Sequence, residues 1–411
     1  MNNVSERMEM DAWRTRLNDE LQGNILGFWM KHAPDDNHGG FFGEITTDLS
    51  VIPDADKSLV LNTRILWTFA AAYRLHGDDS YLVTAKRAYA YILRHFVDQE
   101  YGGLYWMLHA DGTVSNDKKQ VYGQAFAIYA LSEYYRATQQ EEALELAVSL
   151  FGMLEEHSYD PVHKGYVEAL SREWLQTGDF SLSDKDLNEK KSMNTHLHVL
   201  EAYTNLLRVW PEERLKHQLA ELIEVTLSHI VHPDQSRFLL FFDEAWRSKS
   251  GHISYGHDIE GSWLLVEAAE VLGDAALLER VKHTAIAMAE HGLKEGVDPD
   301  GGMVNEADAG GIVDDRKDWW PQAEAMVGFY NAYQMTGDRK FRDASLRSWQ
   351  FIERSIIDHE HGEWFWNADR EGRPNRDEPK VSAWKCPYHN GRACMEMLER
   401  LPQQPFESEE K

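Results

Sequence analysis

The sequence of 411 residues contains little cysteine and no long hydrophobic run. Its two cysteines, Cys386 and Cys394, lack the spacing of a metal-binding motif, and we interpret them as reduced thiols of a cytoplasmic protein. No stretch of about 18 apolar residues occurs, so no membrane-spanning segment is expected. Residues 1–13 are acidic and lack an apolar core, which argues against a signal peptide.

The sequence is also short of positive charge. It has 42 Lys and Arg residues against 69 Asp and Glu residues, and its formal net charge is −27. Such an excess of negative charge disfavours binding to phosphate backbones and to anionic lipids. We therefore expect neither a nucleic acid nor a membrane as a partner.

A short segment of glycine and aromatic residues occurs six times, at intervals of about 60 to 73 residues. The six copies begin at His38, Tyr101, His163, Ser236, Asp300 and His361. Self-similarity of this kind is typical of repeat architectures, in which each unit buries its faces against its neighbours. No linker rich in proline or serine interrupts the repeats, so we predict one catalytic domain over residues 1–411.

Each repeat is predicted to contain a hairpin, a loop, a nearly all-round apolar helix and an amphipathic helix. A helix that is apolar on every side must be buried, whereas a helix with a polar face lies outside. The buried helices are expected to start near Leu59, Lys119, Ser192, His257, Trp319 and Pro387. The outer helices are expected to start near Tyr81, Glu141, Glu212, Ala275 and Arg339, with an N-terminal helix over residues 6–31 as the sixth.

Six inner and six outer helices can close into a ring. This predicts an all-α fold, an (α/α)6 barrel with short β-hairpins at one end. The alternative is an open all-α superhelix, but an N-terminal helix packed beside the last buried helix favours closure. Gly-Asp pairs such as Gly77-Asp78 predict the C-cap of one helix followed by the N-cap of the next.

Each predicted inner helix begins with polar residues where burial would predict apolar ones. These residues are Asn62, Thr63, Arg64, Tyr122, Gln124, Asn194, Thr195, His196, His198, His257, Asp258, Glu260, Gln322, Glu324, His389, Asn390 and Arg392. The first turns of the inner helices converge at one mouth of a closed barrel. We therefore expect these residues to face a common cavity.

The histidines differ in their expected roles. His196 and His198 lie about 200° apart on a helix and point in different directions, so one of them is expected to be structural. His257 and Glu260 are three residues apart and share a face, so the carboxylate is expected to orient the imidazole and raise its pKa. The alternative for this pair is metal binding.

Two reactions compete for such a cavity. An inverting glycosidase needs two carboxylates about 6.5–9.5 Å apart, for which Glu260 and Glu324 are candidates, but the histidines would then have no role. Proton abstraction beside a carbonyl suits histidine, and Arg64 can stabilise the charge of an enediolate. Two bases on opposite faces of the planar enediolate would invert the carbon. The 14 Trp residues favour a sugar as substrate, because the C–H faces of sugars lie flat on indole rings.

Four motifs resemble the cellobiose 2-epimerases of the N-acylglucosamine 2-epimerase superfamily. They span residues 193–201, 254–260, 319–324 and 384–392, and the resemblance extends over essentially the whole chain. It implies an (α/α)6 barrel that converts the reducing-end glucose of a β-1,4-linked disaccharide, such as cellobiose or lactose, into mannose. It implies no cofactor and no metal.

The resemblance also implies a role for individual residues. His389 resembles the group that opens the sugar ring and exchanges the C2 proton on one face. His257 resembles the base on the other face, with Glu260 bonded to it. Arg64 and His198 resemble the groups that hold the carbonyl and enediolate oxygens. The expected substrate contacts are Tyr122, Asn194, Glu324, the stacking residues Trp320 and Trp384, and Asp186 in a long loop.

The superfamily also contains enzymes that act on free mannose or on N-acetylglucosamine, and aldose–ketose isomerases. A mannose 2-epimerase or an isomerase is therefore the alternative function, and an inverting glycoside hydrolase is a more distant one. We expect a small-molecule substrate, a disaccharide or a monosaccharide, and a monomer in the cytoplasm.

Overall fold

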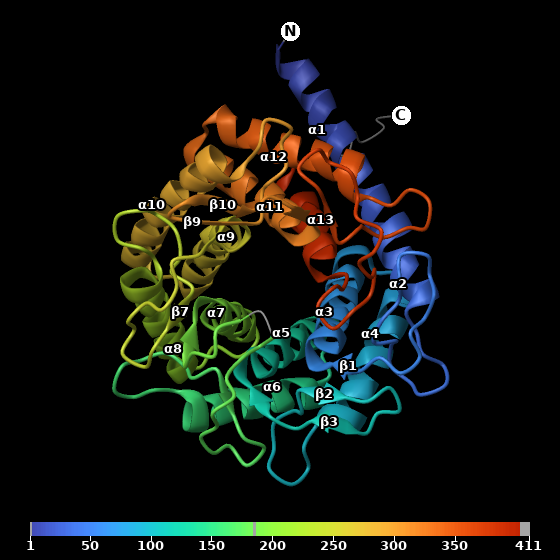
Figure 1. Cartoon of the computed structure of the whole chain (residues 1–411), viewed down its shortest axis with the longest axis vertical. Helices are drawn as coiled ribbons and strands as arrows, with labels where there is room; N and C mark the ends of the chain where they lie inside the picture. Colours follow the sequence, from blue (N-terminus) through green and yellow to red (C-terminus); the bar gives the residue numbers. More distant parts are fainter. Residues whose placement is uncertain (1, 184–185, 403–411) are drawn as a thin grey trace, which may run out of the picture.

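The fold is a closed ring of paired helices, as predicted. A computed structural model describes residues 2–183 and 186–402. The inner helices are α3 (Leu59–His76), α5 (Val121–Thr138), α7 (Met193–Leu207), α9 (Tyr255–Leu272), α11 (Trp319–Thr336) and α13 (Tyr388–Arg400). Each inner helix packs on the next, and α13 packs on α3, which closes the ring and excludes the open superhelix (Figure 1).

The outer layer packs against this ring. Its helices are α4 (Asp79–Tyr91), α6 (Glu141–Met153), α8 (Glu213–Val225), α10 (Ala275–His291) and α12 (Arg339–Phe351). The sixth place is taken by the N-terminal segment, which comprises α1 (Asn2–Asp19), η1 (Glu20–Leu26) and α2 (Gly27–His32). Both α1 and η1 contact α13, so the predicted closure by the N-terminal helix is confirmed (Figure 1).

Local sequence signals set where the helices end. Gly77 ends α3 in the left-handed conformation with φ 71°, and the side chain of Asp78 then accepts a hydrogen bond from the backbone N–H of Ser80 to cap α4. The Gly-Asp pairs at 273–274 and 337–338 act in the same way. The outer helices α4, α6, α8, α10 and α12 each finish in a π turn, and in the N-terminal segment a π turn lies between α1 and α2. These turns are η1, η2 (Ile92–Phe96), η3 (Leu154–Ser158), η4 (Thr226–Ile230), η5 (Gly292–Gly296) and η6 (Ile352–Ile356).

Short strands link each repeat to the next at one end of the barrel. The strands are β1 (Lys57–Ser58), β2 (Met107–Leu108), β3 (Val114–Asn116), β4 (Lys119–Gln120), β5 (Ala169–Leu170), β6 (Lys191–Ser192), β7 (Phe241–Phe242), β8 (Ile253–Ser254), β9 (Glu306–Asp308), β10 (Gly311–Asp314), β11 (Lys317–Asp318) and β12 (Asn367–Ala368). The strand before an inner helix pairs antiparallel with a strand of the following repeat, in the pairs β1–β2, β4–β5, β6–β7, β8–β9 and β11–β12. A bridge between Ile45 and Val381 joins the last repeat to the first.

A buried lysine–aspartate pair recurs at this end of the barrel. In the third repeat, Nζ of Lys191 lies 2.9 Å from Oδ2 of Asp160 and also donates to the backbone carbonyls of Lys164 and Glu244. The equivalent pairs are Lys57–Asp35, Lys119–Asp98, Lys317–Asp298 and Lys380–Asp358. The fourth repeat has Ile253 and His232 at these two positions. Each pair ties the hairpin that follows an outer helix to the strand that begins an inner one.

None of the helices in the described part of the chain combines the length and the apolar character needed to cross a membrane.

The lysine–aspartate pairs predict a specific cost on stability. Lys191→Met should lower the free energy of unfolding by about 3–5 kcal/mol, because it leaves a largely buried carboxylate and two carbonyls without their cation. As a control, Lys216→Met removes an exposed pair with Glu213 and should cost less than about 1 kcal/mol. Chemical denaturation followed by circular dichroism measures both changes. Equal effects of the two substitutions would contradict this account.

Candidate active site

Helix periodicity directs one set of polar side chains toward the barrel axis. Residues at the second and sixth positions of an inner helix are four apart and share a face. The residues at these positions are Arg64, Tyr122, Asn194, His198, Glu260, Trp320, Glu324 and His389. Contacts between neighbouring inner helices connect them: Arg64 donates to the hydroxyl of Tyr122 at 2.8 Å, and the rings of Tyr122 and His198 are 4.9 Å apart. These side chains therefore come together at the N-terminal ends of the inner helices.

A second set at the fourth position of the helices has a structural role instead. Gln124, His196, Asp258 and Gln322 accept hydrogen bonds from backbone N–H groups of Leu104, Tyr166, Phe238 and Met303, respectively. These partners belong to the glycine–aromatic segments that the repeat analysis identified. The expectation that all polar residues at the helix starts face the cavity is therefore wrong for this set. The prediction that one residue of the His196/His198 pair is structural is confirmed for His196.

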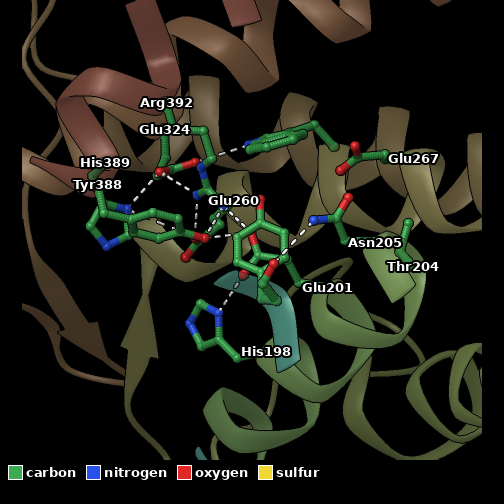
Figure 2. Close-up of polar contacts among 12 residues, drawn as sticks. His198, Glu201, Thr204, Asn205, Glu260, Glu267, Glu324, Tyr388, His389 and Arg392 are labelled. Carbon is green, nitrogen blue, oxygen red and sulfur yellow. Dashed lines mark hydrogen bonds and ion pairs between the residues drawn. The ribbon is translucent and has the colours of Figure 1, made fainter. Parts of the chain in front are cut away.

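The centre of the site is a guanidinium group shared by three carboxylates. Arg392 contacts Glu201 through Nη1, and its Nη2 lies 2.6 Å from Oε1 of Glu260 and 2.7 Å from Oε1 of Glu324. The hydroxyl of Tyr388 also contacts Glu201 and Arg392. All five side chains are buried, so their charges interact with little screening by water (Figure 2).

Two histidines are attached to this cluster through their Nδ1 atoms. Nδ1 of His389 lies 2.7 Å from Oε1 of Glu324, and Nδ1 of His198 lies 3.0 Å from Oε2 of Glu201. Figure 2 shows the two imidazoles at separate ends of the cluster. Because a carboxylate accepts a hydrogen bond from the Nδ1–H group, the Nε2 atom of each neutral ring keeps its lone pair. Burial, together with the nearby Arg64 and Arg392, lowers the pKa of His389 well below its usual range.

His257 has a different environment from the one predicted. Its Nδ1 atom lies 2.7 Å from the hydroxyl oxygen of Ser254, whereas the carboxylate of Glu260 is bonded to Arg392. Desolvation, helped by His198 and Arg64, lowers the pKa of His257 to about 3. The expectation that Glu260 orients His257 and raises its pKa is therefore wrong. The reason is that the nearby guanidinium of Arg392 competes for the carboxylate.

Aromatic rings and the barrel mouth complete the site. The ring of Trp320 is 4.6 Å from that of His257 and 5.6 Å from that of His389, and Trp384 lies 5.8 Å from Tyr122. Both tryptophans are only partly buried. A cavity of about 470 Å³ at this mouth is bordered by residues that include Asp186, Asn194, Ser254 and His257. The sequence-predicted residues from helices and loop are thus brought to one end of the barrel.

A side chain of the protein occupies the place where a metal ion could bind. Glu260, Glu324 and His389 offer ligand atoms within 4.8 Å of one another. Nη2 of Arg392 is hydrogen-bonded to both of these carboxylates, so a guanidinium occupies the place of a cation. The donor set therefore does not fit a metal ion.

Sequence reasoning assigned no role to Glu201, Tyr388 or Arg392. Spacing alone carried a signal for two of them, because Glu201 follows His198 and Arg392 follows His389 by three residues, which places each pair on one helix face. The signal was ambiguous, since the same rule paired His257 with Glu260.

Known proteins match both the sequence and the fold. The family model of the N-acylglucosamine 2-epimerases matches residues 40–393. A cellobiose 2-epimerase of Bacteroides fragilis is 49% identical over 94% of this chain and 98% of its own length. The structure of a cellobiose 2-epimerase from Bacillus thermoamylovorans superposes with a TM-score of 0.90 at 41% identity, over 95% of this chain and 100% of that one. A D-mannose isomerase at 24% identity shares the fold, with a TM-score of 0.83 over 94% of this chain and 98% of that one. The chain belongs to the N-acylglucosamine 2-epimerase family and is an enzyme of the epimerase kind.

Proposed function

We propose that the protein interconverts glucose and mannose at C2 of the reducing-end sugar of β-1,4-linked disaccharides such as cellobiose. The observation that carries this proposal is the pair of imidazoles, His257 and His389, whose rings both lie close to the partly buried ring of Trp320. The sugar preference follows the relatives, since the matched proteins of Bacteroides fragilis and Bacillus thermoamylovorans are named cellobiose 2-epimerases. A monomer in the cytoplasm with a disaccharide as its small-molecule partner remains part of the same proposal.

The two histidines would act on opposite faces of the sugar. The lowered pKa values keep both imidazoles neutral at pH 7, so each can accept a proton. Nδ1 of each ring is engaged, by Ser254 or by Glu324, which leaves Nε2 for the substrate. One Nε2 removes the C2 proton and the enediolate forms. The other imidazole takes up a proton from water and delivers it to C2 on the opposite face, and the first imidazole releases its proton to water. This sequence inverts C2 and leaves the rest of the sugar unchanged.

Arg64 would stabilise the negative charge that develops on the enediolate. The guanidinium is 3% exposed, and it is positioned by the hydroxyl of Tyr122 and by the ring of Phe126, 4.4 Å from its central carbon. A buried and preorganised cation stabilises an oxyanion far more than water does. His198, oriented by Glu201, is the second candidate to hold a substrate oxygen.

The geometry disfavours the glycosidase alternative. An inverting hydrolase needs its two carboxyl groups about 6.5–9.5 Å apart, with room for a water molecule. Glu260 and Glu324 instead offer oxygens within 4.8 Å of each other, and both are hydrogen-bonded to one nitrogen of Arg392. The isomerase alternative shares the enediolate and differs in the carbon that receives the proton, so the reaction products must decide it.

The first functional prediction concerns the products. Incubation with cellobiose in D2O should yield glucosyl-mannose with deuterium at C2 and no free glucose, and NMR measures both. Free glucose as the major product would establish the hydrolase. A keto sugar as the major product would establish the isomerase.

The second prediction tests the two bases separately. His257→Asn should lower net epimerisation by about 10²–10⁴-fold, yet His389 should still exchange C2 hydrogen with D2O in one epimer. His389→Asn should show the reverse preference, or lose exchange altogether if His389 also opens the ring. The control is His217→Asn, on the exposed face of α8, which should behave as the wild type. Equal loss of exchange from both epimers in His257→Asn would mean that a single base serves both faces.

The third prediction concerns pH. Burial, reinforced by Glu324, raises the pKa of Glu260 to about 7, and Oε1 of Glu260 lies 3.9 Å from Nδ1 of His389. The ionised carboxylate makes His389 a stronger base, so kcat/KM should fall as the pH is lowered through about 7. Glu260→Gln should abolish this transition.

Stability provides an independent readout of the same group. The pKa of Glu260 is higher in the folded state than its ordinary value, so the folded state binds this proton more tightly than the unfolded state. Its contribution to the free energy of unfolding is therefore greatest below the ordinary pKa of glutamate and decreases as the pH rises toward about 7. An unchanged pH profile of kcat/KM in Glu260→Gln would contradict the assignment of the transition near pH 7 to Glu260.

A further inference from the structure

A second cavity lies at the opposite end of the barrel. Its volume is about 630 Å³, larger than the cavity beside His257, and within the range of about 300–1,000 Å³ that holds small-molecule ligands. The C-terminal halves of all six inner helices line it, through residues that include Trp67, Tyr129, Asn205, Glu267, Asn331 and Arg400.

The four arginines that line this cavity are each paired with a glutamate that also lines it. Arg74 and Arg136 both contact Glu133, Arg208 contacts Glu267 at 2.7 Å, and Arg400 contacts Glu396 at 3.0 Å. A polyanion would find no unpaired arginine among these four. In the described part of the chain, the grouping of residues suited to a metal ion lies at the other end of the barrel. The cavity wall therefore presents hydrogen-bond donors beside hydrogen-bond acceptors.

Some hydrogen-bonding capacity of the cavity wall is unused. Nε1 of Trp67 and Nδ2 of Asn331 have no hydrogen-bond partner, although both side chains are more than nine-tenths buried. Burial raises the pKa of Glu267 to about 7, so its carboxyl group both donates and accepts near neutral pH. An unpaired buried N–H is costly, but both nitrogens are closed off from the cavity, so a ligand oxygen would reach them only after a local shift of the wall.

We propose that this cavity is a second binding site for an uncharged carbohydrate. A hydroxyl group donates one hydrogen bond and accepts others, so neighbouring hydroxyls match a carboxylate placed beside a guanidinium. An apolar ligand would leave these polar groups unsatisfied, and a charged ligand would be repelled by one half of each ion pair. The stacked rings of Trp67 and Tyr129, 5.1 Å apart, form the aromatic part of the wall.

Glu201 connects this second site to the candidate active site. Its side chain borders the far cavity, while its carboxylate contacts His198, Tyr388 and Arg392. Figure 2 shows Glu201 between His198 on one side and Asn205 and Thr204 on the other. A ligand in the far cavity therefore lies next to the carboxylate that orients a candidate catalytic imidazole. Any coupling between the two sites must be reciprocal.

Counting bound sugar tests the proposal directly. Equilibrium dialysis of the whole protein with radiolabelled cellobiose should give two molecules bound per chain at saturation. Gln334→Trp, an exposed position that borders the far cavity, should reduce the number to one by filling its mouth. Trp320→Ala, at the other end of the barrel, should also bind one molecule per chain. The double variant should bind none.

The control removes an ion pair of the same kind that does not border the cavity. Arg280→Ala removes an exposed pair with Glu224 and should still bind two molecules. One molecule per chain in the wild type, or two in Gln334→Trp, would overturn the second site. The readout does not depend on turnover: two bound molecules without epimerisation would refute the proposed function and leave the second site standing.

Discussion

The buried lysine–aspartate pair that recurs in five of the six repeats is the interaction on which the barrel depends. In the third repeat, Lys191 joins Asp160 of the preceding turn to the backbone of two loops, and it does so without access to water. A buried pair of this kind adds little net stability compared with apolar packing, but losing one partner is costly. Its effect is to fix the register in which each hairpin meets the next inner helix. The fourth repeat lacks both partners at once, with Ile253 and His232 in their place, as expected for groups that are tolerated only together.

Once this register is fixed, helix geometry separates structure from chemistry. The fourth residue of an inner helix points to the hairpin, where Gln124 or His196 holds the backbone of a glycine–aromatic segment. The second and sixth residues lie on the opposite side and face the axis. One turn of helix thus supplies both the support for the loops and the polar groups of the site, which explains why the sequence places so many polar residues at buried positions.

This separation also decides what could be predicted from the sequence. The repeat, the two helix layers and the participation of the N-terminal helix in closing the ring follow from periodicity, because each repeat carries the same pattern. The residues that face the axis were found for the same reason. The hydrogen-bond partner of each imidazole was not predicted. His257 and Glu260 share a helix face, but Arg392 comes from another helix and binds the carboxylate more strongly than a neutral imidazole can. Contacts between helices leave no periodic trace in the sequence, so the carboxylate–arginine cluster could only be seen in three dimensions.

The two proposed bases, His257 and His389, differ in the hydrogen-bond partner of their Nδ1 atoms, because only His389 is attached to the carboxylate–arginine cluster. Burial weakens both as bases, because a protonated imidazole is poorly stabilised away from water. Nδ1 of His389 lies 2.7 Å from the carboxylate of Glu324, whereas Nδ1 of His257 lies 2.7 Å from the neutral hydroxyl of Ser254. A weak base removes a C–H proton efficiently only when the resulting anion is strongly stabilised. Both proton removals lead to the same enediolate, so on the proposed mechanism the charge of Arg64 would lower both barriers through one interaction.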